Sequence, residues 1–262
     1  MSEVVARGSA APPPAILRGA EILRIVAEKN GMPVKATAMA KALGIPRSSA
    51  VNICAALDEV GFLRMSEAGY TLGPKLGELG QAFFSTFAPV RNFAEYCQSV
   101  DPMPMTVQLG TLDAFDVVYL ARHDGKDLIS IASRVGGRLP ANCTALGKAM
   151  LASLDAAQLD LLLDTQPAQL ASLTPDSISD IYALRAALVT TAENGYALDD
   201  EETTPGIVCV AVPLSPRQDI QHAYAVSASI LRVNATPERI ESAVRLLTNL
   251  TQAVSGGSSN TD

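Results

Sequence analysis

The chain has 262 residues, of which 48% are hydrophobic, so it is long and apolar enough for two domains with separate cores. Residues 1–75 hold nine Lys or Arg against six Asp or Glu, and residues 76–262 hold eleven against twenty-one, which excludes the acidic remainder from contact with DNA. The four cysteines lie far apart and no apolar run reaches the ~18 residues of a membrane span, which argues against a disulfide framework, a zinc cluster and a membrane-spanning protein.

Small residues and prolines dominate residues 1–14, which we expect to be disordered. A helical pattern follows and stops at Asn30-Gly31. Its apolar face, with Ile22 and Val26 beside it, is formed by Ile16, Ala20, Leu23 and Ala27. We expect this helix to pack under the elements that come next.

Residues 33–73 predict a helix-turn-helix followed by a β-hairpin. The turn Gly44-Ile45-Pro46 separates a helical pattern at 33–43 from a second one that starts at Arg47 and runs to about Val60. Two short alternating runs, 62–65 and 70–72, flank a turn cluster, so the hairpin would form the wing of a winged helix. A helical hairpin that merely packs is the alternative interpretation.

The second helix of this unit has one apolar and one polar face. The apolar face, which we expect to be buried, consists of Ala50, Ile53, Cys54, Leu57 and Val60. Pro46 suits the first helical position and leaves the next residues among unpaired N–H groups that can hold a phosphate. The candidate DNA contacts are Arg47, Ser48, Ser49, Val51 and Asn52. Arg47 would pair with a phosphate or guanine, Asn52 with adenine, and Val51 with a thymine methyl.

The pattern of residues 74–90 predicts a linker helix. The residues after it predict a domain that contains both helices and strands. The linker's apolar stripe would mediate dimerisation or pack onto its own domain, and comprises Leu76, Leu79, Gly80 and Phe83. A short helix at 90–98 precedes strands at 105–109, 117–122, 129–133, 207–212 and 224–230, and helices at 145–153, 155–164, 177–194 and 237–254. Strands grouped at both ends of a helical middle indicate an α+β domain with a mostly antiparallel sheet.

Several segments resemble one family of bacterial transcription factors. In the first 80 residues these segments are 38–49, 57–63, 70–73 and 76–80. The segments that are more specific to the family lie later in the chain, at 133–140, 143–149, 201–202 and 205–213. In these segments the chain resembles the IclR (isocitrate-lyase-regulator) family. The resemblance implies a dimer or a dimer of dimers on a palindromic operator. It also implies a winged helix-turn-helix at 15–73, a linker helix at 74–90, a GAF-like effector-binding domain at 91–254 and a flexible tail at 255–262.

The resemblance further implies a site for a small organic acid in the second domain. Ala145 and Leu146 would supply backbone donors, and the side-chain contacts would be Asp199, Cys209, Ser227 and Ser229. From the residues alone, a helix that opens near Thr144 offers free N–H donors to an anion. Ser227 and Ser229 alternate onto one face of a strand, although such serines often only pack or face solvent.

Other chemistries have less support. Gly147-Lys148 lacks the remaining residues of a phosphate loop, and residues 199–202 are interpreted as a solvated acidic turn rather than a metal site. With two histidines and no Gly-x-Ser-x-Gly elbow, a hydrolase triad is poorly supported. We therefore expect a soluble cytoplasmic, ligand-responsive DNA-binding regulator that is not an enzyme and needs no metal or cofactor. The alternative is an enzyme acting on a small acid in the GAF-like domain.

Overall fold

The computed structural model describes residues 14–126, 133–214 and 223–256, in two compact units, Met1–Phe84 and Ser85–Asp262. The predicted disorder of residues 1–14 and the predicted loose tail fall almost entirely outside these ranges, as does the strand expected at 129–133. Within the described ranges no helix is long and apolar enough to cross a membrane.

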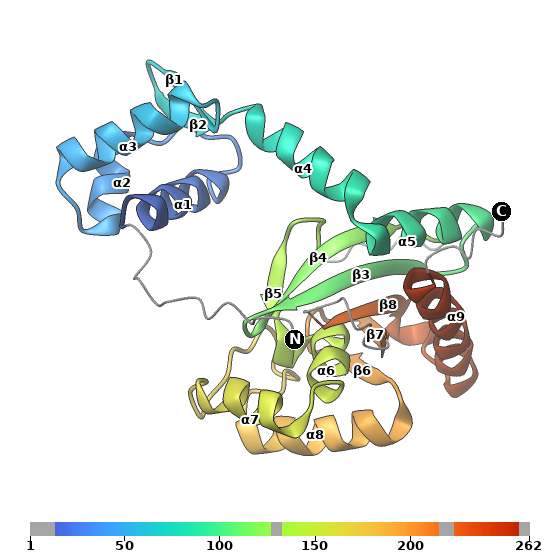
Figure 1. The fold of residues 1–262 in the computed structure, drawn as a ribbon. Helices are drawn as coiled ribbons and strands as arrows, with labels where there is room; N and C mark the ends of the chain where they lie inside the picture. Colours follow the sequence, from blue (N-terminus) through green and yellow to red (C-terminus); the bar gives the residue numbers. More distant parts are fainter. Residues whose placement is uncertain (1–13, 127–132, 215–222, 257–262) are drawn as a thin grey trace, which may run out of the picture. The chain divides into compact units, whose positions relative to one another are not determined.

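The first unit is a helix-turn-helix with a wing (Figure 1). Its elements are α1 (Pro14–Ala27), α2 (Ala36–Leu43), α3 (Arg47–Glu59), β1 (Leu63–Ser66) and β2 (Gly69–Leu72). Gly44 ends α2 with a φ of 63°, a left-handed conformation that glycine adopts without steric cost. The two strands pair antiparallel, with Leu63 opposite Leu72. The predicted helix-turn-helix and hairpin are thus confirmed.

The buried face of α1 is not the predicted one. Ile22 and Val26 lie in the core, whereas the side chain of Ile16 is 67% exposed and Ala20 is exposed. Gly19 is buried on the same face, where a Cβ added to it would lie 3.8 Å from Ile53 on α3, so this face of α1 is the one that packs against α3. On α3, Ala50 and Cys54 are fully buried as predicted, but Val60 follows the helix and is 55% exposed.

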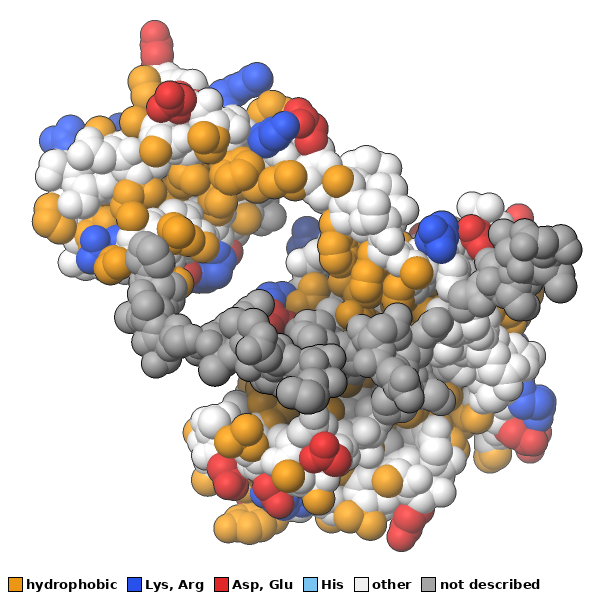
Figure 2. Space-filling model, viewed as in Figure 1, with side chains coloured by type: hydrophobic (Ala, Val, Ile, Leu, Met, Phe, Trp, Pro, Cys, Tyr) orange, Lys and Arg blue, Asp and Glu red, His pale blue; other side chains and the backbone are white. Residues whose placement is uncertain are grey.

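The helix α4 (Lys75–Thr86) buries none of its residues. Within the predicted stripe, Leu79 is 49% exposed and Leu76 is half-buried. A second apolar surface lies on α1 and α3, where Ile16, Leu23 and Phe62 line a groove. Figure 2 shows hydrophobic side chains gathered over this face of the unit.

The second unit is built on one antiparallel sheet with the strand order β5-β4-β3-β8-β7-β6. The strands are β3 (Thr106–Asp113), β4 (Asp116–His123), β5 (Arg138–Pro140), β6 (Ala197–Asp200), β7 (Ile207–Pro213) and β8 (Tyr224–Leu231). The α+β class and the antiparallel sheet are confirmed. β5 and β6 were not predicted, because three or four residues carry too little alternation to be recognised.

Helices cover both faces of this sheet (Figure 1). α5 (Ala88–Ser99) and α9 (Pro237–Ser255) pack on one face; α6 (Ala145–Ala152), α7 (Ala156–Asp164) and α8 (Ile181–Asn194) lie on the other. The helix expected from Ser177 begins four residues later, because the Asp180 carboxylate accepts the N–H groups of Tyr182 and Ala183 and caps it there.

Candidate DNA-binding helix and ligand site

The predicted DNA contacts lie on one side of α3. Arg47, Ser48, Val51 and Asn52 are exposed and Ser49 is half-buried, while Ala50 and Cys54 face the core. Pro46 precedes the helix instead of occupying its first position, and its carbonyl accepts the N–H of Ala50 at 3.2 Å. The N–H groups of residues 47–49 therefore have no intrahelical acceptor, which makes this end suitable for a phosphate.

Two further basic side chains belong to the same unit and were not singled out from the sequence. Lys35 directly precedes α2, and Arg64 lies on the wing strand β1; both are exposed. Among the residues that the structure describes, neither they nor Arg47 form an ion pair. Arg24, by contrast, is held by Glu21 and Glu28 on its own helix. An exposed cation that forms no ion pair is available for a phosphate contact.

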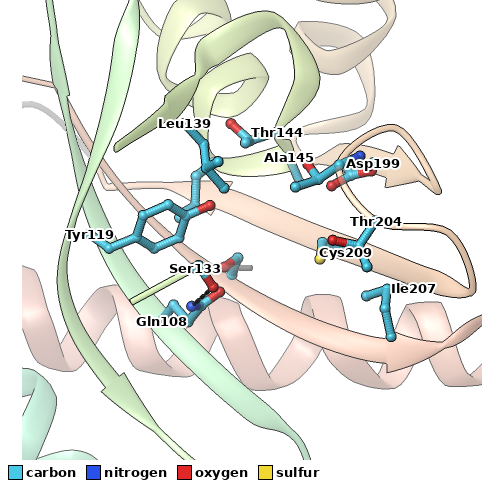
Figure 3. Close-up of a pocket in the computed structure, with 13 residues that line it drawn as sticks. Gln108, Tyr119, Ser133, Leu139, Thr144, Ala145, Asp199, Thr204, Ile207 and Cys209 are labelled. Atoms are coloured by element: carbon cyan, nitrogen blue, oxygen red, sulfur yellow. Dashed lines mark hydrogen bonds between the residues drawn. The ribbon is translucent and has the colours of Figure 1, made fainter. Parts of the chain in front are cut away.

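A small cavity lies between the start of α6 and the sheet (Figure 3). Its volume is about 20 Å³, and five of the six predicted ligand residues line it: Ala145, Leu146, Asp199, Cys209 and Ser227. Ser229 does not line it, but its hydroxyl lies 3.5 Å from the Cys209 sulfur. The remaining wall consists of Gln108, Tyr119, Ser133, Leu139, Thr144, Thr203, Thr204 and Ile207.

Strand register brings the distant side chains of this site together. Asp199 on β6 is opposite Cys209 on β7, and Cys209 is opposite Ser229 on β8. One row along, Ser227 on β8 is opposite Gln108 on β3. Residues directly opposite in a sheet point to the same face, so these five side chains share the face that α6 covers.

The first turn of α6 is fixed in its position against this face. The Thr144 hydroxyl accepts the N–H of Gly147, and its carbonyl accepts the N–H of Lys148, both at 3.0 Å. A Cβ on Gly147 would lie 2.2 Å from the Ala141 carbonyl oxygen, so only glycine fits here. In the described part of the chain the N–H groups of Ala145 and Leu146 have no acceptor, and they remain as donors at the cavity.

Apart from the Asp199 carboxylate, the polar side chains of the cavity are neutral. Burial raises the pKa of the Tyr119 phenol and raises the pKa of the Cys209 thiol to about 12, so both groups stay protonated at neutral pH. Tyr119 points from β4 toward the cavity, and near it the Gln108 amide donates to the Ser133 hydroxyl (Figure 3). No Lys or Arg is among the described residues that line the cavity, so an anion there would meet N–H and O–H donors and one carboxylate, Asp199.

An ion pair is buried behind this wall. Lys148 on α6 pairs with Glu202, and their side chains are 4% and 10% exposed. The other oxygen of Glu202, Oε2, is buried without a hydrogen-bond partner. Burial raises the pKa of Glu202 and Lys148 opposes that shift. The described residues contain no cluster of His, Cys, Asp and Glu suited to a metal ion.

The interpretation of residues 199–202 as a solvated acidic turn was wrong for Asp199 and Glu202, which are 2% and 8% exposed. The reason is tertiary: β6 joins the sheet through β7, and side chains far along the chain hold the turn. Thr174 donates to the carbonyl of Glu201 at 2.8 Å, and Ser177 to that of Glu202 at 2.6 Å. No local pattern signals these contacts.

Comparisons with known proteins match both units. Residues 99–256 match the family described as "Bacterial transcriptional regulator IclR C-terminal", and residues 15–66 match "IclR helix-turn-helix domain". The HTH-type transcriptional regulator XynR of Escherichia coli (strain K12) is 35% identical over 201 residues, which cover 75% of this chain and 78% of that protein.

Solved structures match over nearly the whole chain. The IclR transcriptional regulator from Alicyclobacillus acidocaldarius has a TM-score of 0.79 at 26% identity and covers 93% of this chain and 98% of its own. An IclR homolog from Microbacterium hydrocarbonoxydans, solved in complex with 4-hydroxybenzoate, has a TM-score of 0.72 at 22% identity and covers 93% of this chain and 100% of its own. At 22% identity, the likeness to the Microbacterium hydrocarbonoxydans protein shows a shared fold only.

The buried ion pair gives a first prediction. Lys148→Met leaves the Glu202 charge buried without its cation, so it should lower the free energy of unfolding by about 3–5 kcal/mol. The loss should shrink as the pH falls, because protonated Glu202 carries no charge. The double variant Lys148→Met/Glu202→Met should recover most of the stability. Urea unfolding checks this, with Arg185→Met as the control, because its pair with Asp160 is exposed. A Lys148→Met protein as stable as wild type contradicts the prediction.

Proposed function

Because this chain belongs to the IclR family of bacterial transcriptional regulators, we propose that it changes its affinity for DNA when a small organic acid binds beneath α6. Proteins of this family are DNA-binding regulators and not enzymes. In this proposal residues 15–73 bind DNA and residues 91–254 bind the effector. Residues 74–90 form the helix that links these two domains. The observation that carries the effector half is the cavity lined by the unpaired donors of Ala145 and Leu146.

The proposed DNA contact is the exposed side of α3 in the major groove. Arg47, Val51 and Asn52 would reach base edges, while the N–H groups at the helix start and Ser48 and Ser49 would meet a phosphate. Lys35 and Arg64 would add backbone contacts on either side. The phosphate contacts would position the protein on the duplex, and the contacts to base edges would read the sequence. Specific binding needs both kinds of contact.

The proposed assembly is a homodimer or homotetramer on a palindromic operator. A palindrome needs two recognition helices about one helical turn, ~34 Å, or a multiple of it apart, and a single chain supplies one. The apolar stripe of α4 suits an interface between two copies, since Leu79 on it is 49% exposed.

The proposed effector is a small carboxylic acid. Its carboxylate would accept the N–H groups of Ala145 and Leu146, where the helix start also favours negative charge. The Tyr119 and Ser227 hydroxyls line the same cavity and would donate to the remaining oxygens. The relative solved with 4-hydroxybenzoate is too distant to define the effector of this chain, so the class is argued from these donors.

The enzyme alternative finds no support in this cavity. A nucleophilic cysteine needs a lowered pKa, whereas burial raises the pKa of Cys209 to about 12. No histidine is among the described residues that line the cavity, so a general base of the kind used in hydrolases is missing there.

For DNA binding, we expect Arg47→Ala and Asn52→Ala each to weaken specific binding by roughly 1–3 kcal/mol if the contact is bidentate to a base. If Arg47 contacts a phosphate, the loss should be equal for all sequences and the salt slope should fall by about one per subunit. Arg24→Ala removes the same charge from α1 and should change little. Fluorescence anisotropy with an operator selected from random duplexes measures this. Unchanged affinity in both α3 variants argues against the helix assignment.

For assembly, light scattering at micromolar concentration should show a dimer or tetramer. Leu79→Glu should shift the protein toward monomers, because it places a charge in the apolar stripe. Gln81→Glu introduces the same side chain on the opposite side of α4 and should leave the assembly intact. Monomeric wild-type protein, or equal behaviour of the two variants, excludes an α4 interface.

For effector binding, Ser227→Ala should cost about 1.5–3 kcal/mol if its hydroxyl donates to a carboxylate. Ser229→Ala should cost less, because that hydroxyl contacts Cys209 and does not line the cavity. The double variant should keep DNA binding and lose its response to effector. Calorimetry against a panel of small aliphatic and aromatic acids tests this, and affinity equal to wild type in Ser227→Ala would place the site elsewhere.

A further inference from the structure

The exposed side of α3 carries two apolar side chains. Val51 is 38% exposed, and Ala55, one turn later, is exposed as well. Among the described residues, neither belongs to the core of the first unit or to the groove that α1 and α3 line. Residues four apart stack on one side of a helix, so Val51 and Ala55 form one small apolar surface, the α3 strip.

Charged groups on the same side of α3 show which end of the helix suits DNA. Arg47 lies one turn before Val51 and is exposed, whereas Asp58 and Glu59 are exposed at the far end. Asp58 also accepts the N–H of Met65 on the wing strand at 2.9 Å. Phosphates attract the first end and repel the second. The half of α3 that holds Arg47 and Val51 is therefore the half that fits against the duplex.

One kind of base edge matches an apolar side chain. In the major groove thymine presents a C5-methyl group, and the other groups by which bases are told apart there donate or accept hydrogen bonds. Val51 has no group that can make a hydrogen bond, and its branched side chain is stiff, so it loses little rotamer freedom on contact. Ala55 is small and leaves room for the base edge beside Val51.

Building on the proposed contact of α3 with DNA, we propose that the α3 strip reads the C5-methyl group of a pyrimidine in each half-site, whichever base carries it. Thymine and 5-methylcytosine share this methyl group and differ at C4, where Val51 has no donor or acceptor to sense the difference. The consequence is regulatory. Methylation of a cytosine at this position raises operator affinity, independently of the effector.

The first test removes the methyl group from the DNA. An operator is selected from random duplexes with the full chain, and its thymines are replaced one at a time by deoxyuridine, which keeps every hydrogen-bonding group. Fluorescence anisotropy should show a loss of about fourfold at one thymine of each half-site, which corresponds to one buried methyl group. The losses should multiply when both half-sites are changed.

Two variants assign this loss to the α3 strip. Val51→Ala removes the contact, so it should bind the thymine and deoxyuridine operators equally. Val60→Ala is the matched control, because Val60 is 55% exposed but follows the helix, and it should keep the difference seen with wild type. Thermal unfolding checks that both proteins fold. Comparing the effect of deoxyuridine in wild type and variant isolates the contact, as in a double-mutant cycle.

The second test changes the base that carries the methyl group. The thymine–adenine pair that responds to deoxyuridine is replaced by cytosine–guanine or by 5-methylcytosine–guanine. Wild type should bind the methylated duplex about fourfold more tightly than the unmethylated one, and Val51→Ala should bind the two alike. Equal binding of these duplexes by wild type overturns the response to methylation.

The remaining outcomes separate this inference from the function on which it rests. A deoxyuridine loss that persists in Val51→Ala arises from the shape of the DNA and overturns the role of the α3 strip. Specific binding in which no thymine responds to deoxyuridine overturns that role too, and leaves the DNA-binding function intact. If the chain shows no preference among random duplexes, the proposed sequence-specific binding is itself overturned.

Discussion

The first turn of α6 constrains everything around the ligand cavity. It buries the N–H groups of Ala145 and Leu146 without acceptors among the described residues, and unmet buried donors cost about 1–3 kcal/mol each. The turn cannot rotate to bring these N–H groups to an acceptor. Thr144 caps it, and the Ala141 carbonyl leaves room only for glycine at position 147. Under the proposed function, these two donors would stay ready for an anion, and their cost would be offset when one binds.

The same turn connects the cavity to the loop on its far wall. Lys148 follows Gly147 directly and pairs with Glu202, while Thr203 and Thr204 of that loop line the cavity. Thr203 also donates to the Cys143 carbonyl at 2.7 Å, just before α6. A ligand that moves this loop must move α6 with it or break a buried ion pair. The physical link from ligand to helix is thus a short set of named contacts.

Local signals in the sequence predicted much of this fold, and tertiary contacts explain the rest. The turn at Gly44 and the long apolar strands β7 and β8 have strong patterns of their own, so they were predicted. The predicted buried face of α1 was wrong because two apolar rows compete on that helix, and only the packing against α3 selects the row with Ile22 and Val26. Lys148 and Glu202 are 54 residues apart, and no spacing rule joins them. Tyr119 was likewise not predicted as a cavity residue, because only the pairing of strands in the sheet brings β4 beside α6.

The size of the cavity bears on how a ligand can regulate the protein. About 20 Å³ holds one water molecule or little more, so a three-carbon acid requires the walls to separate. This conformation therefore binds the acid less well than one with an expanded cavity. A ligand shifts a conformational equilibrium only by its difference in affinity between two states, and under the proposed function a small cavity lined with ready donors would supply that difference. Because α6 and the loop 201–206 are joined through Lys148, an expanded cavity would rearrange both, and under the proposed function effector binding would change these two elements together rather than one side chain.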